Sequence, residues 1–127
     1  MNTVKILNQE YDVKTTTELD LSCKNLDVIP QEVFELINLQ KLDLSINEIQ
    51  IIPEEICNLT NLQELCINNN EIQVIPKEIS NLINLQELYL SNNEIQIIPK
   101  EIGNLINLQV LYYVGMKFKL FQKQLVI

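Results

Sequence analysis

The sequence predicts an α/β solenoid of stacked repeats, each with a strand, a turn and a short helical return. The first observation is a period of 23 residues, which brings most of the 127-residue chain into register with itself. The second is a pair of apolar columns at this period, and the third is the recurrence of all four prolines. The columns are Leu19, Leu42, Leu65, Leu88 and Leu111; Leu21, Leu44, Ile67 and Leu90; and Pro30, Pro53, Pro76 and Pro99. A fixed period of this length is typical of a solenoid.

Within each unit, the spacing of the apolar residues changes from every second to every third position. Leu42 and Leu44 flank a polar residue, and this alternation is typical of a strand with one buried face. Pro53 is followed by two glutamates, which favours the start of a short helix with proline at its first position. Ile56 and Leu59 are three positions apart and can face the same core. The unit therefore reads as a strand, a turn and a helical or 3-10 return.

Residues 1–17 lie outside the repeats. Val4 and Ile6, then Tyr11 and Val13, flank a polar stretch, which suits a short strand pair or an extended segment. A solenoid must cover the apolar end of its first unit. Residues 1–17 are therefore predicted to form an N-terminal cap.

Three segments carry a family resemblance: Leu42-Asp-Leu-Ser-Ile-Asn47, Leu65-Cys-Ile-Asn-Asn-Asn70 and Leu88-Tyr-Leu-Ser-Asn-Asn93. They resemble the leucine-rich repeat, and the Ile-Pro-x-x-Ile-x-x-Leu continuation is similar to its 23-residue intracellular class, found in Ras-suppressor-like and bacterial proteins. The resemblance covers residues 18–111 as about four full units. It implies a right-handed solenoid with a short parallel sheet on the concave side and helical or 3-10 returns on the convex side. It also implies protein–protein binding as the usual role.

A ladder of asparagines is expected inside the solenoid. Asn47, Asn70 and Asn93 lie where the chain turns inward, and a buried amide must find hydrogen-bond partners in the turning backbone. Lys24 takes this position in the first unit, with its ammonium group in solvent, and Met116 takes it in the fifth, where it cannot complete the ladder.

The tail, residues 112–127, departs from the repeat. It has no Asn, Pro or acid and carries three lysines, so it is either an amphipathic cap or a repeat read in the wrong frame. Codons for residues 116–127 exist that, read two bases on, give Glu-Ile-Gln-Ile-Ile-Pro-Lys-Ala-Ile-Gly-Asn, which matches residues 94–104 except at one position. We expect the frame to shift between Tyr112 and Met116, which the gene sequence tests. The last core face would then be poorly covered, which invites either fraying or self-association through the C-terminal end.

Composition argues against most other roles. The chain has 17 acids and 9 basic residues, all lysine, for a net charge of −8 at pH 7. This charge repels nucleic acid and anionic membranes, and the absence of arginine removes bidentate phosphate recognition. A partner protein with a basic surface is favoured instead. No histidine and only two glycines are present, so we expect no catalytic triad, zinc site, phosphate-binding loop or cofactor, and no enzyme activity.

The three cysteines indicate the compartment. Cys23, Cys57 and Cys66 are odd in number and share no spacing, so reduced thiols are the simpler reading. The start of the chain lacks the apolar run of a signal peptide, and no stretch reaches the ~18–20 apolar residues of a membrane span. A cytoplasmic protein is expected.

The residues beside the core leucines are the candidate binding site. Strand side chains alternate, so these residues face the concave surface in three columns. The columns are Glu18, Lys41, Glu64, Glu87 and Val110; Asp20, Asp43, Cys66, Tyr89 and Tyr112; and Ser22, Ser45, Asn68, Ser91 and Val114. The binding residues are predicted to be Asp20, Lys41, Asp43, Glu64, Cys66, Asn68, Glu87, Tyr89, Ser91 and Tyr112. The alternative is a solvated sheet face without a partner.

A second surface competes with the concave one. It consists of two apolar columns outside the core pattern, Val28, Ile51, Val74 and Ile97, and Ile37, Ile83 and Ile106. We expect them to be partly buried between units, and the alternative is an exposed strip for self-association.

The sequence thus favours a non-enzymatic protein–protein interaction module that binds its partner on the concave face. The alternative is a truncated or frameshifted remnant of a repeat array with no specific function of its own. An enzyme ranks third, with no residue to assign to it.

Overall fold

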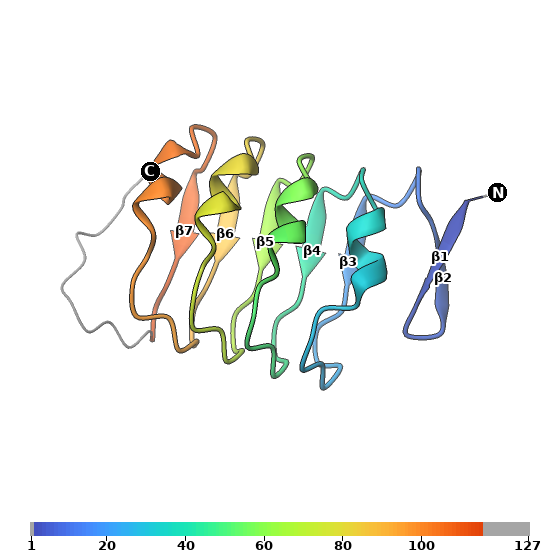
Figure 1. The fold of residues 1–127 in the computed structure, drawn as a ribbon, viewed down its shortest axis with the longest axis horizontal. Coiled ribbons are helices and arrows are strands. Elements are labelled where there is room, and N and C mark those ends of the chain that lie inside the picture. The colour runs from blue at the N-terminus through green and yellow to red at the C-terminus, as the bar shows by residue number, and fades with distance from the viewer. Residues whose placement is uncertain (1, 116–127) are drawn as a thin grey trace.

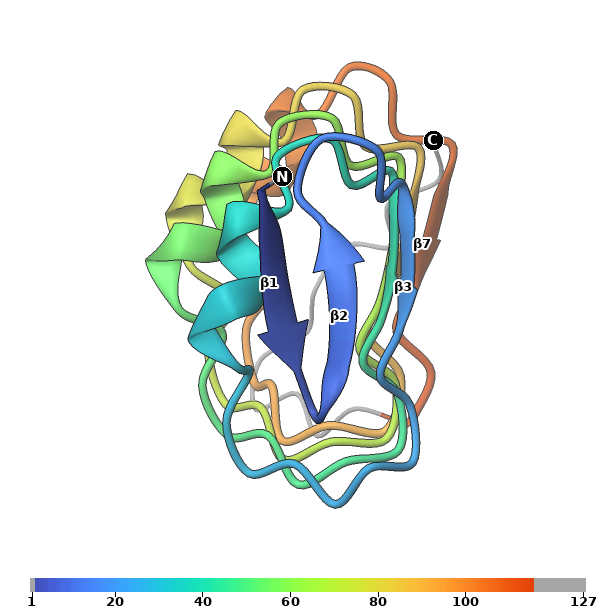
Figure 2. The ribbon, with the colours of Figure 1, turned by 90° about the vertical axis from the view of Figure 1, so that its right-hand side faces the viewer.

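The repeats stack into a solenoid with a parallel sheet on one side and 3-10 helices on the other (Figures 1 and 2). The computed structural model describes residues 2–115. Within them, the sheet has five strands in chain order, β3 (Glu18–Asp20), β4 (Lys41–Asp43), β5 (Glu64–Cys66), β6 (Glu87–Tyr89) and β7 (Val110–Tyr112). The helices are η1 (Gln31–Glu35), η2 (Glu54–Asn58), η3 (Lys77–Asn81) and η4 (Lys100–Asn104). The predicted solenoid, with its parallel sheet and 3-10 returns, is confirmed.

The strands pair with an offset of one repeat. Leu42 lies opposite Leu19 on one side and Leu65 on the other, so identical positions form straight columns. The ladder continues beyond the strands, as where the Leu44 N–H donates to the Cys66 carbonyl at 2.8 Å. The central leucines of β3 to β6 are at most 4% exposed, whereas Leu111 of β7 is half-buried.

The helical returns close the core from the other side. Each helix buries one apolar residue completely, as Val33 and Ile56 do, and burying such a side chain stabilises by about 1.5–3 kcal/mol. The prolines lie one residue earlier than predicted. Pro53 has an extended ψ of 150° and precedes the first helical residue, and its carbonyl accepts the Ile56 N–H at 3.1 Å. Proline thus fixes φ for the entry into the helix without being part of it.

A β-hairpin lies across the N-terminal end of the solenoid (Figure 2). It consists of β1 (Thr3–Ile6) and β2 (Gln9–Asp12), which pair antiparallel as the strand pair predicted for residues 1–17. Leu7 and Asn8 both have positive φ, as a two-residue turn between antiparallel strands requires. Ile6 is 1% exposed, and Val4 and Val13 are also buried in the common core.

The three asparagines of the expected ladder are buried and link neighbouring units. The amide nitrogen of Asn70 donates to the carbonyls of Leu44 and Ile67 at 3.0 and 3.2 Å, and its oxygen accepts the Ile49 N–H at 3.0 Å. Asn47 and Asn93 make equivalent bonds. Each amide therefore ties the turn of its own unit to the unit before it. Met116 lies outside the described residues.

A second asparagine series, which the sequence reasoning missed, lies at the opposite corner. The amide nitrogens of Asn38, Asn61, Asn84 and Asn107 each donate to a carbonyl of the preceding unit, those of Lys14, Ile37, Thr60 and Ile83. Its signal was present in the recurrence of Asn three positions before each of the strands β4 to β7. Unlike the first series, it lies at the solvent-exposed edge.

A left-handed backbone position also recurs once per unit. The residues with positive φ at this position are Cys23, Ile46, Asn69, Asn92 and Gly115. At Gly115 an added Cβ would meet the Asn92 amide oxygen, so a side chain there would require the Asn92 side chain of the unit before to shift. The fifth unit therefore keeps the repeat's turn as far as Gly115.

The second apolar surface differs from expectation. Ile51 is 74% exposed and Val74 69%, and the related columns are exposed throughout, so the expectation of partial burial is wrong. For the column that contains Ile51, the reason lies in the extended segment that carries it. Ile49 and Ile52 both fill the core, which leaves the intervening Ile51 pointing outward. The two predictions for the end of the tail, a cap or a frameshifted repeat, fall on residues 116–127, outside the described part.

Candidate functional site

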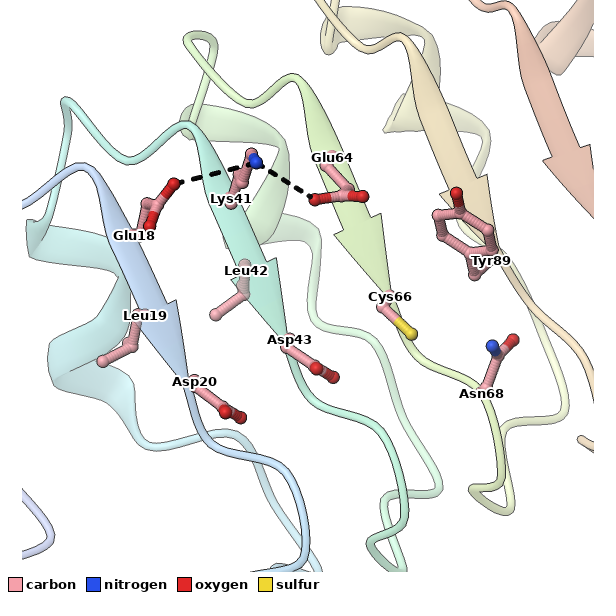
Figure 3. A pocket seen from close by; sticks show the side chains of 10 residues that line it. All are labelled: Glu18, Leu19, Asp20, Lys41, Leu42, Asp43, Glu64, Cys66, Asn68 and Tyr89. Atoms are coloured by element: carbon pink, nitrogen blue, oxygen red, sulfur yellow. Dashed lines mark ion pairs between the residues drawn. The ribbon is translucent and has the colours of Figure 1, made fainter.

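The outward-facing side chains of sheet β3–β7 are here called the concave face. A hollow of about 610 Å³ lies over its strands β3 to β6 (Figure 3). Its lining consists of Glu18, Leu19, Asp20, Lys41, Leu42, Asp43, Glu64, Cys66, Asn68 and Tyr89. Seven of the predicted binding residues are among them. Glu87 and Tyr112 lie on the same sheet, in β6 and β7, beside the hollow.

The only lysine in these strands lies between two glutamates (Figure 3). The Lys41 ammonium is 3.8 Å from a Glu18 carboxylate oxygen and 3.9 Å from one of Glu64. The three residues occupy equivalent positions on β3, β4 and β5, which brings them together. Exposed pairs of this kind contribute about 0–1 kcal/mol each, so their role is to arrange charge on the surface.

Two aspartates are held in place by serines two residues further along. The Asp20 carboxylate accepts the Ser22 hydroxyl at 2.6 Å and the Ser22 N–H at 2.9 Å, and Asp43 does the same with Ser45. The Ser22 hydroxyl and then its N–H lower the pKa of Asp20. The two carboxylates face the same side of neighbouring strands in a fixed orientation.

The C-terminal strands contribute an aromatic pair. The ring centroids of Tyr89 and Tyr112 lie 6.0 Å apart with the planes tilted by 33°, which is within the range of a favourable aromatic contact. The Tyr89 hydroxyl donates to the Glu87 carboxylate at 2.5 Å. This hydrogen bond, followed by burial, raises the pKa of Tyr89 to about 12. The phenol is therefore neutral at physiological pH, with its ring orientation fixed by Glu87.

Ser91 does not belong to the surface, which corrects its assignment as a binding residue. It is 7% exposed, and its hydroxyl accepts the Val114 N–H at 3.0 Å while its own N–H donates to the Asn68 side chain at 2.6 Å. These hydrogen bonds to the two neighbouring units hold Ser91 in a buried position between them. Val114 is 66% exposed and lies in the column assigned to Ser91, so it extends the apolar end of the face.

The thiols of Cys57 and Cys66 show no sign of activation. Burial raises the pKa of Cys66, and it raises that of the buried Cys57 to about 11, so both are protonated at neutral pH. No three or more His, Cys, Asp or Glu side chains among residues 2–115 are grouped so as to hold a metal ion. In the same range, no helix has the length and apolar character needed to cross a membrane.

Comparison with known proteins identifies the repeat. The family model described as a leucine-rich repeat region matches residues 18–126. A leucine-rich-repeat protein of Leptospira interrogans is 36% identical, with a TM-score of 0.69 over 84% of this chain and 33% of that one. Internalin C2 of Listeria monocytogenes is 30% identical, with a TM-score of 0.71 over 80% of this chain and 44% of its own.

A plant protein is similar as well. The plant peptide hormone receptor RGFR1, solved in complex with RGF2, is 44% identical, with a TM-score of 0.72 over 80% of this chain and 17% of the receptor. A comparison with curated proteins found no match. The chain spans less than half the length of each of these three solved structures. The match to the family model and the shared solenoid show that the chain belongs to the leucine-rich-repeat proteins.

Proposed function

We propose that the chain is a protein-interaction module whose partner binds the concave face. The observation that carries this proposal is the hollow over β3 to β6, where charged and aromatic side chains point away from the core around one open surface. Leucine-rich-repeat proteins are in general non-enzymatic interaction modules, and the solved RGFR1 receptor is in complex with RGF2. A cytoplasmic location stays a prediction from the cysteines.

The charge on this face favours a partner with a basic surface. Glu18, Asp20, Asp43 and Glu64 line the hollow with Lys41 as its one base. Complementary charge accelerates encounter and excludes acidic proteins more than it adds affinity. Binding is therefore expected to weaken as salt is added, since the Debye length falls to ~8 Å at physiological ionic strength.

Affinity capture with paired variants tests the site. The chain is immobilised and exposed to a lysate of its source cells, alongside the double variant Asp43→Lys/Glu64→Lys and the single variant Tyr89→Ala. The control is Glu54→Lys/Glu55→Lys, which changes the net charge equally but lies on the exposed return of η2. We expect the concave variants to lose the captured protein and the control to retain it. Far-UV circular dichroism checks that every variant is folded.

A partner that is kept by both concave variants and lost by the η2 control would place binding on the convex side. The alternative function is a repeat remnant with no specific partner. This alternative is favoured by the match between residues 94–104 and the tail when its codons are translated in the shifted frame. For a remnant, no captured protein responds to any of these substitutions.

A further inference from the structure

The concave face is divided into two chemically different halves. In β3 to β5 it carries the carboxylates of Glu18, Asp20, Asp43 and Glu64, here called the acidic half. In β6 and β7 and the turn that follows, here called the aromatic half, it carries Tyr89, Val110, Tyr112 and Val114 together with Glu87, whose carboxylate accepts the Tyr89 hydroxyl. Tyr112 is 53% exposed and Val114 66%, so the aromatic half offers open apolar side chains on an otherwise polar face.

One row of side chains runs straight through both halves. The strand register places Asp20, Asp43, Cys66, Tyr89 and Tyr112 side by side across the sheet. Neighbouring strands lie ~4.8 Å apart, so the row is roughly 19 Å long and matches about six residues of extended chain at ~3.3 Å each. A single peptide segment is therefore long enough to contact both ends.

The parallel row next to it already contains its own cation. Lys41 lies between Glu18 and Glu64 within ion-pair distance of both, so part of the negative charge in that row is compensated. In the row that contains Asp20 and Asp43, both carboxylates are held in place by serines and lie directly opposite each other. Like charges in register repel, and a cation from a partner removes that repulsion.

We propose that this row binds an extended partner segment of about six residues, with basic side chains at the end over Asp20 and Asp43 and an aromatic or large aliphatic side chain at the end over Tyr89 and Tyr112. This inference rests on the proposed function and specifies the chemistry of the partner. Tyr89 and Tyr112 are suited to the apolar end, because tyrosine offers a large contact area at a low cost in side-chain entropy. A segment with basic residues alone uses only the acidic half.

Synthetic peptides test the two-part recognition by fluorescence anisotropy. The probes are labelled Lys-Arg-Lys-Ser-Ser-Leu-Phe, Lys-Arg-Lys-Ser-Ser-Ser-Ser and Glu-Asp-Glu-Ser-Ser-Leu-Phe. We expect the first to bind about tenfold more tightly than the second, the equivalent of one well-buried apolar contact, and the third not to bind. Equal affinity for the first two peptides would overturn the inference.

Paired variants locate the apolar end. In Tyr112→Thr/Val114→Thr, threonine keeps a good strand former at Tyr112 in β7, while Val114 lies in the turn that follows. The advantage of the first peptide over the second should disappear, and binding of the second should be unchanged. The matched control, Val74→Thr/Ile97→Thr, removes two exposed apolar side chains from outside the concave face and should leave both affinities as they are. An advantage that survives in the Tyr112→Thr/Val114→Thr variant contradicts the assignment of the apolar end.

The two proposals fail in different ways. If the concave variants lose the captured protein but the peptides show no two-part preference, the chain binds on this face and the inference about the partner's chemistry is wrong. If neither the captured protein nor the peptides respond to concave substitutions, both proposals are wrong.

Discussion

Residue 46 combines a β-branched side chain with a left-handed backbone conformation. Ile46 has a φ of 56°, and a side chain branched at Cβ is strained there by about 1–3 kcal/mol. Two later units place asparagine at the same position, Asn69 and Asn92, which adopts this conformation more readily. The Ile46 side chain is 55% exposed, so its replacement removes little buried contact.

We therefore expect Ile46→Asn to raise the free energy of unfolding by about 1 kcal/mol, through relief of backbone strain. Urea denaturation followed by circular dichroism measures the change. Ile51→Asn is the control, because Ile51 is equally apolar and 74% exposed but does not have positive φ. An equal gain from both substitutions would show that lost surface apolarity, and not the backbone, is responsible.

At the scale of the repeat unit, the two asparagine series differ in how much the fold depends on them. Asn70→Ala leaves the buried Ile49 N–H without its amide partner, whereas the Leu44 carbonyl still accepts the amide nitrogen of Asn47. A buried N–H without a partner costs about 1–3 kcal/mol, and we expect a loss in this range. Asn61→Ala removes the same chemical group at an exposed carbonyl, that of Ile37, which water can hydrate, and should cost under about 1 kcal/mol.

Thermal and urea unfolding of both variants measures these losses. Since the substitutions are chemically identical, their difference reports the burial of Asn70 together with the backbone N–H that only Asn70 satisfies. Equal losses would mean that water reaches the inner ladder, which would contradict the burial of Asn70 at 6% exposure.

The elements of a unit were predictable where residue type and position recur together. The leucine columns, the inner asparagines and the alternation of the strands all repeat at 23 residues, so each follows from the sequence. The left-handed position recurs in backbone geometry but not in residue type, since it is occupied by Cys, Ile, Asn, Asn and Gly. Ile51 and Ile52 are both apolar and adjacent, and only the folded chain shows which of the two faces outward.

The candidate site was likewise predictable in part. The concave columns follow from strand alternation, and the strand register aligns their members across one face of the sheet. The burial of Ser91 was not predictable, because it results from hydrogen bonds to Asn68 and Val114 in two other units. The ion pairs of Lys41 likewise require the alignment of three units.

For the whole molecule, stability depends on contacts between neighbouring units. Among the described elements, the backbone of each strand and helix of a unit lies close only to its counterparts in the adjacent units, apart from the hairpin, where β1 lies close to η1. Such an array behaves as a chain of unit stabilities and nearest-neighbour interfaces. A defect in a central unit weakens interfaces on both sides, whereas one in a terminal unit weakens a single interface.

The difference between central and terminal units can be tested at Leu65 and Leu111, which occupy the same position of the repeat, with the same substitution to alanine. Leu65 is fully buried in β5, and Leu65→Ala should cost about 3–5 kcal/mol, at the upper end for a leucine that leaves a cavity. Leu111 in β7 is half-buried, and Leu111→Ala should cost about 1–2 kcal/mol. Urea unfolding at several protein concentrations measures both. A loss at Leu111 as large as that at Leu65 would contradict the half-buried position of Leu111. If that loss also grows with protein concentration, a second copy of the chain covers this end, as the predicted self-association requires.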